Sequence, residues 1–383
     1  MASAYIWDKP DSATGTALAA MPAYLDYNAT TPIEPAAVEA MTAAARAWAN
    51  PSSVHGAGRK AKGALEAARE QMARYLSCQP QAIVFTSGGT EALGLTLHGV
   101  PAATRIVSAV EHSAVLAQAG GAIVAPVDGD GIIDLAALEG LLAQAEGPVL
   151  VAVMQVNNET GVIQPIDGVL RLARDHGARV LVDAVQAAGK LSLPAADFVA
   201  VSAHKLGGPP GVGALIVRCA EDLSAVQRGG GQERGFRAGT ENLPGIAGFA
   251  AALEARADTN WIARVTEMRD RLEERLRAGV PSVEIFGAGA PRLGTTSCIR
   301  MPGVAASTQL IALDLAGYQV SSGAACSSGK VKASHVLAAM GIGPEAAGEA
   351  IRVSLGWHTT AAEVESFAEA WTSLAKRQAA KAA

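Results

Sequence analysis

The chain has 383 residues, half of them hydrophobic, which is long enough for about two domains and a large buried core. Its formal net charge of −5 is not that of a nucleic-acid-binding protein, which is typically basic. The four cysteines show no C-x-x-C spacing, which argues against a disulfide framework or a structural zinc site and favours a reducing compartment.

The first 23 residues carry no hydrophobic period, so we expect them to pack on a smaller domain or to be disordered. They contain neither the basic start nor the unbroken apolar core of a secretory signal. The longest apolar run of the chain, residues 149–156, is too short to cross a bilayer. We therefore expect a cytoplasmic protein that does not associate with membranes.

From about residue 33 to residue 257, strand-like apolar runs alternate with amphipathic segments. This alternation is typical of a mostly parallel sheet with helices on both faces. It predicts a large α/β domain over residues 24–257.

A strand-like run, residues 82–86, leads into Ser87, Gly88 and Gly89, and an apolar helical stretch begins near Thr90. Free N–H groups and the positive end of the helix dipole bind a phosphate at such a turn, and the Thr90 hydroxyl adds a donor. The alternative is a plain capping turn, in which Thr90 caps the helix and no ligand binds.

Two further strand-like runs each deliver a chemically useful residue to the carboxyl edge of the sheet, where open α/β sheets bind ligands. Residues 179–183 end in Asp183, and residues 198–201 are followed by Lys205 just before a glycine- and proline-rich turn. A Schiff-base lysine needs a partly desolvated, cationic site, and a buried aspartate keeps a pyridine nitrogen protonated. The pair therefore predicts a pyridoxal phosphate site.

Neighbouring polar residues are candidates for the rest of that site. Gln186, three residues after Asp183, can donate to the phenolic oxygen of the cofactor, and Ser202 and His204 can help to hold its phosphate. Each residue also has an ordinary interpretation. A lone lysine is usually solvated, a lone aspartate after a strand often caps a helix, and His204 can be a packed core histidine.

The sequence pattern changes from residue 258 onward. Residues 261–278 predict a charged amphipathic helix, and the charged segment after Thr359 predicts a terminal helix that frays. Three strand-like runs lie between them: residues 283–286, 296–299 and 351–354. Together these elements predict a smaller α/β domain over residues 258–383.

Cys326 lies in a Gly/Ser-rich segment, residues 321–332, which has no hydrophobic period and is expected to be a mobile loop. A thiol that takes sulfur from a cofactor-bound substrate and passes it to another protein must reach both places, which a loop allows. Lys330 and Lys332 favour the reactive thiolate. The remaining cysteines are interpreted as small buried hydrophobes: Cys78, Cys219 and Cys298.

In their order along the chain, these motifs resemble cysteine desulfurases of the NifS/IscS type. These proteins belong to the class V aminotransferase group of fold-type I pyridoxal phosphate enzymes. The resemblance covers nearly everything after Tyr24. It rests on residues 24–31, 50–56, 86–91, 111–112, 157–161, the segments ending at Asp183 and Lys205, residues 229–235 and residues 321–326. It implies a large domain with a mostly parallel seven-stranded sheet, a smaller α/β domain and a homodimer.

The resemblance also implies roles around the cofactor ring. Lys205 is implied to be the lysine that bonds to the cofactor, and Asp183 and Gln186 are implied to pair with the ring nitrogen and the phenolic oxygen. His112 is implied to stack on the ring and to do acid/base work on the substrate, which suits a side chain that titrates near neutral pH.

Further roles are implied for the phosphate and the substrate. The implied phosphate contacts are Gly89, Thr90, Ser202 and His204, with Thr240 reaching the phosphate bound by the neighbouring subunit. Asn158 is implied to contact both cofactor and substrate. Arg352 is implied to bind the substrate carboxylate through two parallel hydrogen bonds; its alternative is a surface ion pair at the start of a strand.

The reaction implied by the resemblance converts L-cysteine to L-alanine, with attack of Cys326 on the substrate sulfur and a persulfide on the enzyme. The sulfur would pass to a scaffold or carrier protein for iron–sulfur cluster or other thio-cofactor assembly. Selenocysteine lyase, another C–S lyase and an aminotransferase share Lys205 and Asp183 and stay open as alternatives. A catalytically silent scaffold protein is the alternative outside enzymes.

Overall fold

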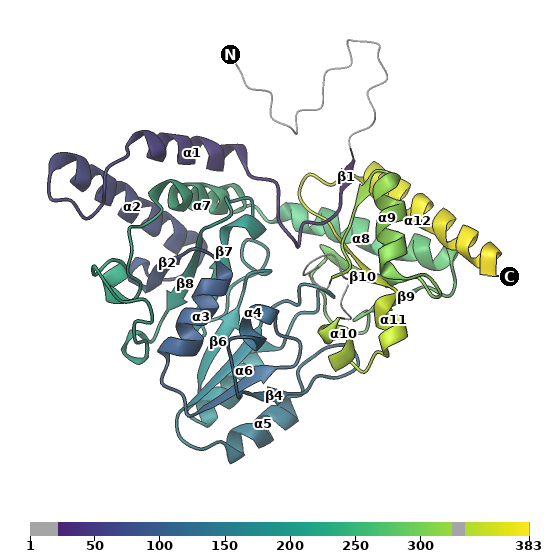
Figure 1. Ribbon diagram of the computed structural model, residues 1–383, viewed down its shortest axis with the longest axis horizontal. Helices are drawn as coiled ribbons and strands as arrows, with labels where there is room; N and C mark the ends of the chain where they lie inside the picture. Colours follow the sequence, from purple (N-terminus) through teal and green to yellow (C-terminus); the bar gives the residue numbers. More distant parts are fainter. Residues whose placement is uncertain (1–21, 324–333, 383) are drawn as a thin grey trace, which may run out of the picture.

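The computed structural model describes residues 22–323 and 334–382, which form two lobes (Figure 1). The first lobe holds the larger sheet, and the second lobe holds two smaller sheets and the terminal helix. Cys326 lies outside the described residues. Among the described residues, no helix combines the length and the apolar character needed to span a membrane.

The first lobe is built on a seven-stranded sheet, which confirms the predicted fold class. Its strands are β2 (Ile83–Thr86), β3 (Thr104–Ser108), β4 (Ile123–Ala125), β5 (Val149–Met154), β6 (Arg179–Asp183), β7 (Phe198–Ser202) and β8 (Gly213–Val217). They lie in the order β2-β8-β7-β6-β5-β3-β4. Only β8 runs antiparallel to its neighbours, so β2, β3, β5, β6 and β7 all end at one edge.

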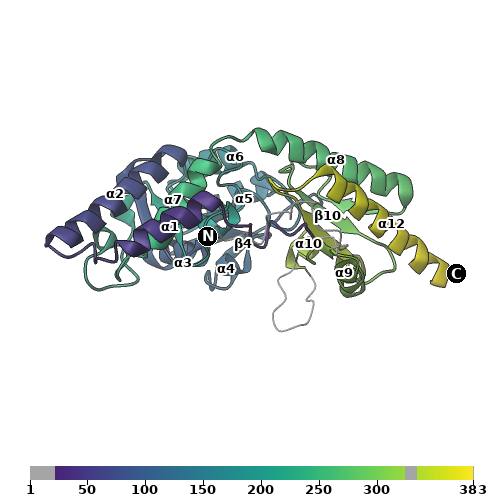
Figure 2. The same ribbon diagram turned by 90° about the horizontal axis from the view of Figure 1, so that it is seen from above.

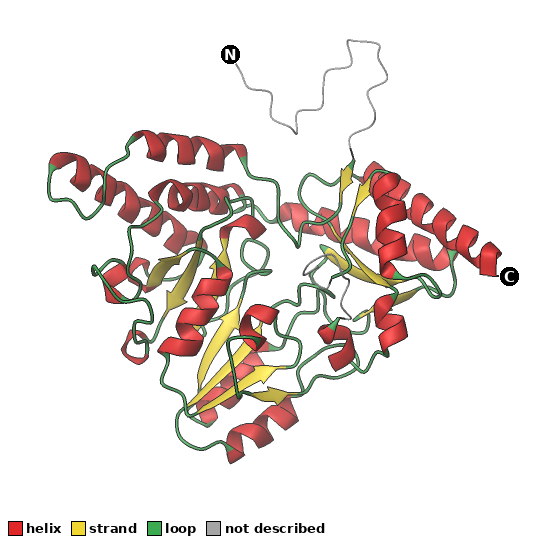
Figure 3. Ribbon diagram, viewed as in Figure 1, coloured by secondary structure: helices red, strands yellow, loops and turns green. Residues whose placement is uncertain are grey.

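Helices cover both faces of this sheet (Figure 3). They are α1 (Pro35–Arg46), α2 (Gly56–Tyr75), α3 (Gly89–Gly99), α4 (Ser113–Leu116), α5 (Leu135–Gln144), α6 (Ile166–Asp175) and α7 (Leu243–Ala255). On β6, Val180 and Val182 belong to the core shared with α1, α2, α5, α6 and α7. Leu181 points to the opposite face and packs with α3 and α4, as the two-residue period of a strand requires.

The second lobe packs helices on an antiparallel sheet of order β12-β10-β9. Its elements are α8 (Asn260–Gly279), β9 (Glu284–Phe286), β10 (Thr296–Arg300), α9 (Ala306–Leu315), α10 (His335–Ala339), α11 (Pro344–Gly348), β12 (Ala350–Ser354) and α12 (Ala361–Ala382). Helices α8 and α12 lie side by side, joined by ion pairs such as Arg275–Glu365 (Figure 2). Phe367 and Trp371 of α12 are completely buried in the core of this lobe.

The chain starts in the second lobe and then crosses to the first. Strand β1 (Ala23–Tyr24) pairs in parallel with β11 (Tyr318–Gln319). After β1, the Asn28 N–H donates to the Ser354 hydroxyl at 3.0 Å, and the Asn28 amide donates to Thr296 at 2.9 Å. The predicted domain boundaries stay predictions, and the described start of the chain belongs to the second lobe.

Candidate active site

The carboxyl edge of the large sheet and the facing part of the second lobe enclose a cavity of about 490 Å³. The strands deliver their last residues there: Asp183 follows from β6, Ser202 from β7 and Met154 from β5. Ten predicted site residues line the cavity: Gly89, Thr90, His112, Asn158, Asp183, Gln186, Ser202, His204, Lys205 and Arg352. The parallel strands therefore bring together residues that are far apart in the sequence.

Lys205 ends a short 3-10 helix, Ala203–Lys205, that directly follows β7. Its Nζ donates to the Asn28 carbonyl at 2.5 Å and to the Ala29 carbonyl at 2.8 Å. Burial, together with the guanidinium charge of Arg352, lowers the pKa of the amine to about 8. A fraction of the amine is therefore unprotonated near neutral pH, which is the nucleophilic form.

Asp183 is a buried carboxylate that lines the cavity. Its Oδ1 accepts from the Val185 N–H at 2.9 Å, and nothing in the described part of the chain donates to Oδ2. Burial raises the pKa of Asp183 to about 6, although the Val185 N–H and the charge of Lys205 act in the opposite direction. A protonated nitrogen at Oδ2 would offset this desolvation.

His112 caps the short helix α4 through its ring. The Ala114 N–H donates to His112 Nδ1 at 3.1 Å, so the neutral ring carries its proton on Nε2. Burial lowers the pKa of His112, and the charges of Lys205 and His335 lower it further. At neutral pH the side chain is thus a neutral imidazole with an Nε2–H to donate.

Helix α3 begins at the cavity without a side-chain cap. Gly88 occupies the N-cap position and Thr90 is the second helical residue, so the alternative in which Thr90 caps the helix is wrong. A Cβ on Gly89 would lie 2.7 Å from Val185 Cγ2, so only glycine fits there without a shift of its neighbour. The open N–H groups and the adjacent Ser202 form a cradle suited to an anion.

His204 lies at the same edge, with Nδ1 3.2 Å from the Thr30 hydroxyl. Burial lowers the pKa of His204 to about 4, and the charge of Lys205 adds to this effect. The ring is therefore neutral at pH 7. Because it lines the cavity, the alternative of a packed core histidine does not describe its position.

Arg352 reaches the cavity from β12 of the second lobe. Its Nη2 pairs with Asp26 Oδ1 at 2.7 Å, and its Nη1 donates to the Asn158 carbonyl at 3.0 Å. The side chain is 5% exposed, so the alternative of a surface ion pair is wrong. Nε is buried without a partner among the described residues.

Sequence reasoning missed several residues that support these groups. Asp26 holds Arg352, and the backbone of Asn28 accepts from Lys205. Glu111 is fully buried, and burial together with the charge of Asp183 raises the pKa of its carboxyl group. Lys190 donates to Gln186 at 3.3 Å. Only the four-residue spacing from Gln186 to Lys190 could have been read from the sequence as a contact.

Two predicted site residues are not part of this cavity. Cys326 lies outside the described residues. Thr240 is exposed and lines a separate surface pocket with Trp48 and Asn50. A role of Thr240 at a phosphate would therefore require a second copy of the chain.

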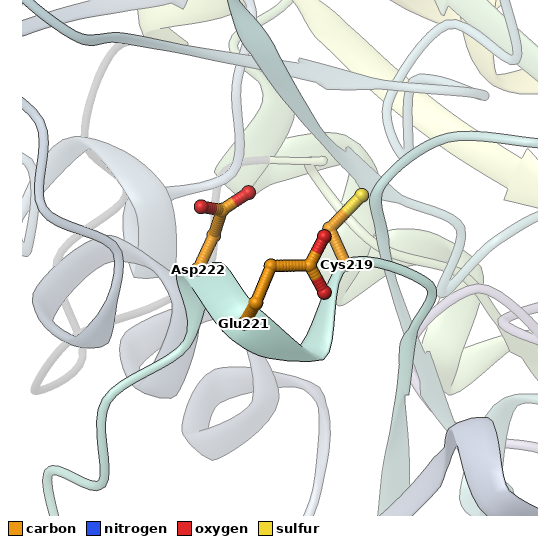
Figure 4. Close-up of side chains that lie close together, drawn as sticks. All are labelled: Cys219, Glu221 and Asp222. Atoms are coloured by element: carbon orange, nitrogen blue, oxygen red, sulfur yellow. The ribbon is translucent and has the colours of Figure 1, made fainter.

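The other cysteines differ in burial. Cys298 is buried, as predicted, whereas Cys78 and Cys219 are only half-buried because each follows the end of an element. Cys219 lies near Glu221 and Asp222 (Figure 4). Two of these three potential metal ligands already have protein partners: the thiol donates to Asp197, and Asp222 pairs with Arg179.

Comparisons with known proteins identify the family. The family model Aminotransferase class-V matches residues 23–367. The chain belongs to the class V aminotransferase family. A cysteine desulfurase of Cereibacter sphaeroides is 42% identical over 365 residues, which cover 90% of this chain and 94% of that protein.

Solved structures of class V aminotransferase relatives share the fold. A NifS-like protein from Rickettsia africae superposes with a TM-score of 0.84 at 34% identity, covering 92% of this chain and 99% of that chain. SspA, solved in complex with cysteine, has a TM-score of 0.76 at 30% identity, covering 88% of this chain and all of that chain (100%). The fold is therefore that of fold-type I pyridoxal phosphate enzymes.

Proposed function

We propose that this chain is a pyridoxal-phosphate-dependent cysteine desulfurase, which converts L-cysteine to L-alanine and leaves the sulfur as a persulfide on Cys326. The observation that carries the proposal is the convergence of Lys205, Asp183 and Arg352 on one cavity from both lobes. The identity to a cysteine desulfurase and the cysteine complex of a structural relative support the same substrate.

The cavity residues fit the cofactor at each of its polar groups. Asp183 Oδ2 is open to a protonated ring nitrogen, and the uncapped start of α3 is open to a phosphate. Gln186 Nε2 donates to the Asn28 carbonyl at 3.0 Å and has a second N–H for the phenolic oxygen. When bound, the cofactor would supply an electron sink for the substrate's α-carbon.

The remaining groups suit the amino acid substrate. Arg352 and Asn158 line the same cavity as Lys205 and would bind the substrate carboxylate. Because Asp26 and the Asn158 carbonyl already occupy both terminal nitrogens of Arg352, the carboxylate would share these donors and use Nε. His112 would donate its Nε2 proton to the reacting substrate.

Sulfur transfer would take place at Cys326. Its thiolate would attack the substrate sulfur, so that an S–S bond forms while the C–S bond breaks. The electron pair of the broken bond would end in a C–H bond of L-alanine, which needs no external oxidant or reductant. The persulfide sulfur would then pass to an acceptor protein for iron–sulfur cluster or other thio-cofactor assembly.

A homodimer is part of the proposal. Thr240 would reach a phosphate in the second subunit, which agrees with its exposed position away from its own cavity. Trp48, which is 84% exposed, lies in the same pocket and would be covered by the second copy.

The proposal is tested by incubating the purified, cofactor-loaded protein with L-cysteine and a reductant, and measuring sulfide and alanine. We expect both products from the wild type, and a loss of about a hundredfold or more in Cys326→Ala because the acceptor thiol is gone. Cys219→Ala is the matched control and should keep its rate, since Cys219 lies outside the cavity.

Full sulfide release by Cys326→Ala would overturn the persulfide step, and transamination in that variant would indicate an aminotransferase. Parallel turnover of selenocysteine separates a selenocysteine lyase from a desulfurase. A wild-type protein that stays colourless with pyridoxal phosphate, showing no visible absorption that borohydride bleaches, would support the silent scaffold instead.

A further inference from the structure

A second lysine lies immediately behind the cavity and has no role in the proposed reaction. Lys190 is 7% exposed and is not among the residues that line the cavity. Its Nζ donates to Gln186 Oε1 at 3.3 Å. A buried lysine is uncommon, because removing an ammonium from water costs free energy unless a specific partner is present.

The backbone after β6 places Lys190 against Gln186. Residues 185–190 form consecutive turns, in which the Ala188 N–H donates to the Ala184 carbonyl and the Leu191 N–H donates to the Ala187 carbonyl. In such helical turns, residues four positions apart lie on the same side. Gly189, the residue directly before Lys190, has a φ of 73°, a left-handed conformation that L side chains adopt rarely.

The two partners of Gln186 determine which way its amide faces. A lysine ammonium only donates, so it selects the amide oxygen, and the Asn28 carbonyl only accepts, so it selects the amide nitrogen. The same Asn28 carbonyl accepts from Lys205 at 2.5 Å. A continuous set of hydrogen bonds thus joins the buried lysine, through Gln186, to the lysine in the cavity.

We propose that Lys190 is a positioning residue that holds the Gln186 amide with its N–H group, and not its carbonyl oxygen, toward the cavity. This inference rests on the proposed function, because the group that Gln186 would meet is the phenolic oxygen of the cofactor. Without Lys190, the Asn28 carbonyl is the only partner in the described part of the chain that opposes rotation of the amide by half a turn. A rotated amide presents its carbonyl oxygen to a negatively charged oxygen, which is repulsive.

A purely structural role for Lys190 makes a different prediction. Burial, together with the charge of Lys205, lowers the pKa of Lys190 to about 7, so the site disfavours the charged amine. Methionine has nearly the same length without a charge or a donor, and it should maintain the packing. A structural lysine would therefore affect unfolding alone, whereas a positioning lysine would affect the cofactor.

The test is a pH titration of the visible absorption of the cofactor-loaded protein. We expect Lys190→Met to raise the titration midpoint by about one pH unit, because the lost donor had stabilised the negative charge on the phenolic oxygen. Lys60→Met, which removes an exposed lysine, is the matched control and should leave the midpoint unchanged. Thermal unfolding of the same samples measures the structural effect separately.

A double-mutant comparison shows whether Lys190 acts through Gln186. Gln186→Leu should raise the midpoint by itself, and adding Lys190→Met should change it no further. An equal additional shift in the double variant would overturn the proposal, as would an unchanged midpoint in Lys190→Met. If Lys190→Met does not fold, Lys190→Leu is tested in its place: a raised midpoint supports the proposal, and an unchanged midpoint overturns it.

Failure of this inference is distinguishable from failure of the proposed function. If the wild type binds no pyridoxal phosphate, the proposed function fails and the inference fails with it. If the wild type binds the cofactor and desulfurates L-cysteine while Lys190→Met titrates like the wild type, only the inference about Lys190 fails.

Discussion

Burial shifts the pKa values of several cavity side chains in the direction that disfavours their charged forms. The pKa of Asp183 is raised to about 6, and the pKa values of Lys205 and Lys190 are lowered to about 8 and 7. Perturbations of this kind cluster at functional sites. At Asp183 the protein alone supplies one N–H donor and no contacting cation within its described part, so ionisation of the carboxylate costs stability.

Because ionisation of the buried Asp183 carboxylate costs stability, we expect the effect of Asp183→Asn on the cofactor-free protein to depend on pH. Because the pKa of Asp183 is raised from 3.8 to about 6 in the folded state, its protonated form contributes stability below pH 4. This contribution is lost as the pH rises through 6. We expect Asp183→Asn to raise the free energy of unfolding by up to about 3 kcal/mol at pH 8, with a smaller gain at pH 5. Urea unfolding at both pH values measures this.

The control for this prediction is Asp175→Asn, which removes an exposed carboxylate and should change stability little at either pH. Asp183→Asn should also weaken pyridoxal phosphate binding, because a neutral amide does not retain the ring-nitrogen proton. Equal destabilisation by Asp183→Asn at both pH values would contradict the electrostatic explanation.

At the residue scale, the sequence predicted the groups that follow strands and missed those that support them. The strand ends sufficed to place Asp183 and Lys205 at one edge. The pairing of Asp26 with Arg352 joins residues 326 positions apart and depends on how the two lobes meet, which no local pattern encodes.

At the scale of elements, the β2–α3 unit is the part most directly shaped for an anion. Strand β2 ends at Thr86, and α3 starts at Gly89 with no side-chain cap among its described contacts. Val185, on the turn after Asp183, packs close to the space that a Cβ on Gly89 would occupy. The start of α3 and the turn after Asp183 therefore constrain each other.

This close approach predicts that Gly89→Ala is destabilising despite the higher helix propensity of alanine. A Cβ 2.7 Å from Val185 Cγ2 is overpacked, and we expect a loss of about 1–3 kcal/mol in the free energy of unfolding and weaker cofactor binding. Denaturant unfolding and a fluorescence titration with pyridoxal phosphate measure the two effects.

The control is Gly63→Ala within α2, where an added Cβ meets nothing within 4 Å. That variant should gain about 0.5–1 kcal/mol from helix propensity alone. Combining Gly89→Ala with Val185→Ala should restore cofactor binding because it removes the clashing methyl group. A Gly89→Ala protein as stable as Gly63→Ala would refute the packing argument.

Element types were predictable where hydrophobic periods were long. The helix expected over residues 261–278 is α8, Asn260–Gly279, and the strand expected over residues 296–299 is β10, Thr296–Arg300. The two-residue strands β1 and β11 were missed, because a pair of residues has no period to detect.

At the scale of the whole molecule, residues of both lobes line the cavity. In the proposed homodimer, Thr240 of a second copy of the chain would add to it. The fold class was predictable from alternating strand and helix patterns together with the family resemblance. The contact between lobes was not, since it depends on side chains such as Arg256, which follows α7 and whose guanidinium lies 4.3 Å from the ring centre of Trp357 in the second lobe.

The proposed homodimer predicts that Trp48→Asp produces monomers. Trp48 is 84% exposed beside Thr240, so a buried charge at this position would oppose association. We expect pyridoxal phosphate to bind about tenfold more weakly to the variant, because each phosphate loses the hydrogen bond from the partner's Thr240. Sedimentation velocity and a cofactor titration measure these changes.

Leu315→Asp provides the control for Trp48→Asp. Leu315 is equally exposed, at 84%, but lies on α9 of the second lobe. This variant should sediment like the wild type and bind the cofactor normally. A wild-type protein that sediments as a monomer, or a Trp48→Asp variant that remains dimeric, would contradict this location of the interface.

The crossing segment between β1 and α1 has a consequence for how the molecule tolerates change. Its Asn28 is anchored to Thr296 and Ser354 of the second lobe, while Thr31 accepts from the Gly207 N–H in the loop that carries Lys205. This short backbone segment therefore fixes both the distance between the two lobes and the position of the Lys205 amine. An insertion or deletion there would misalign both at once, so the length of this largely buried segment is strictly constrained.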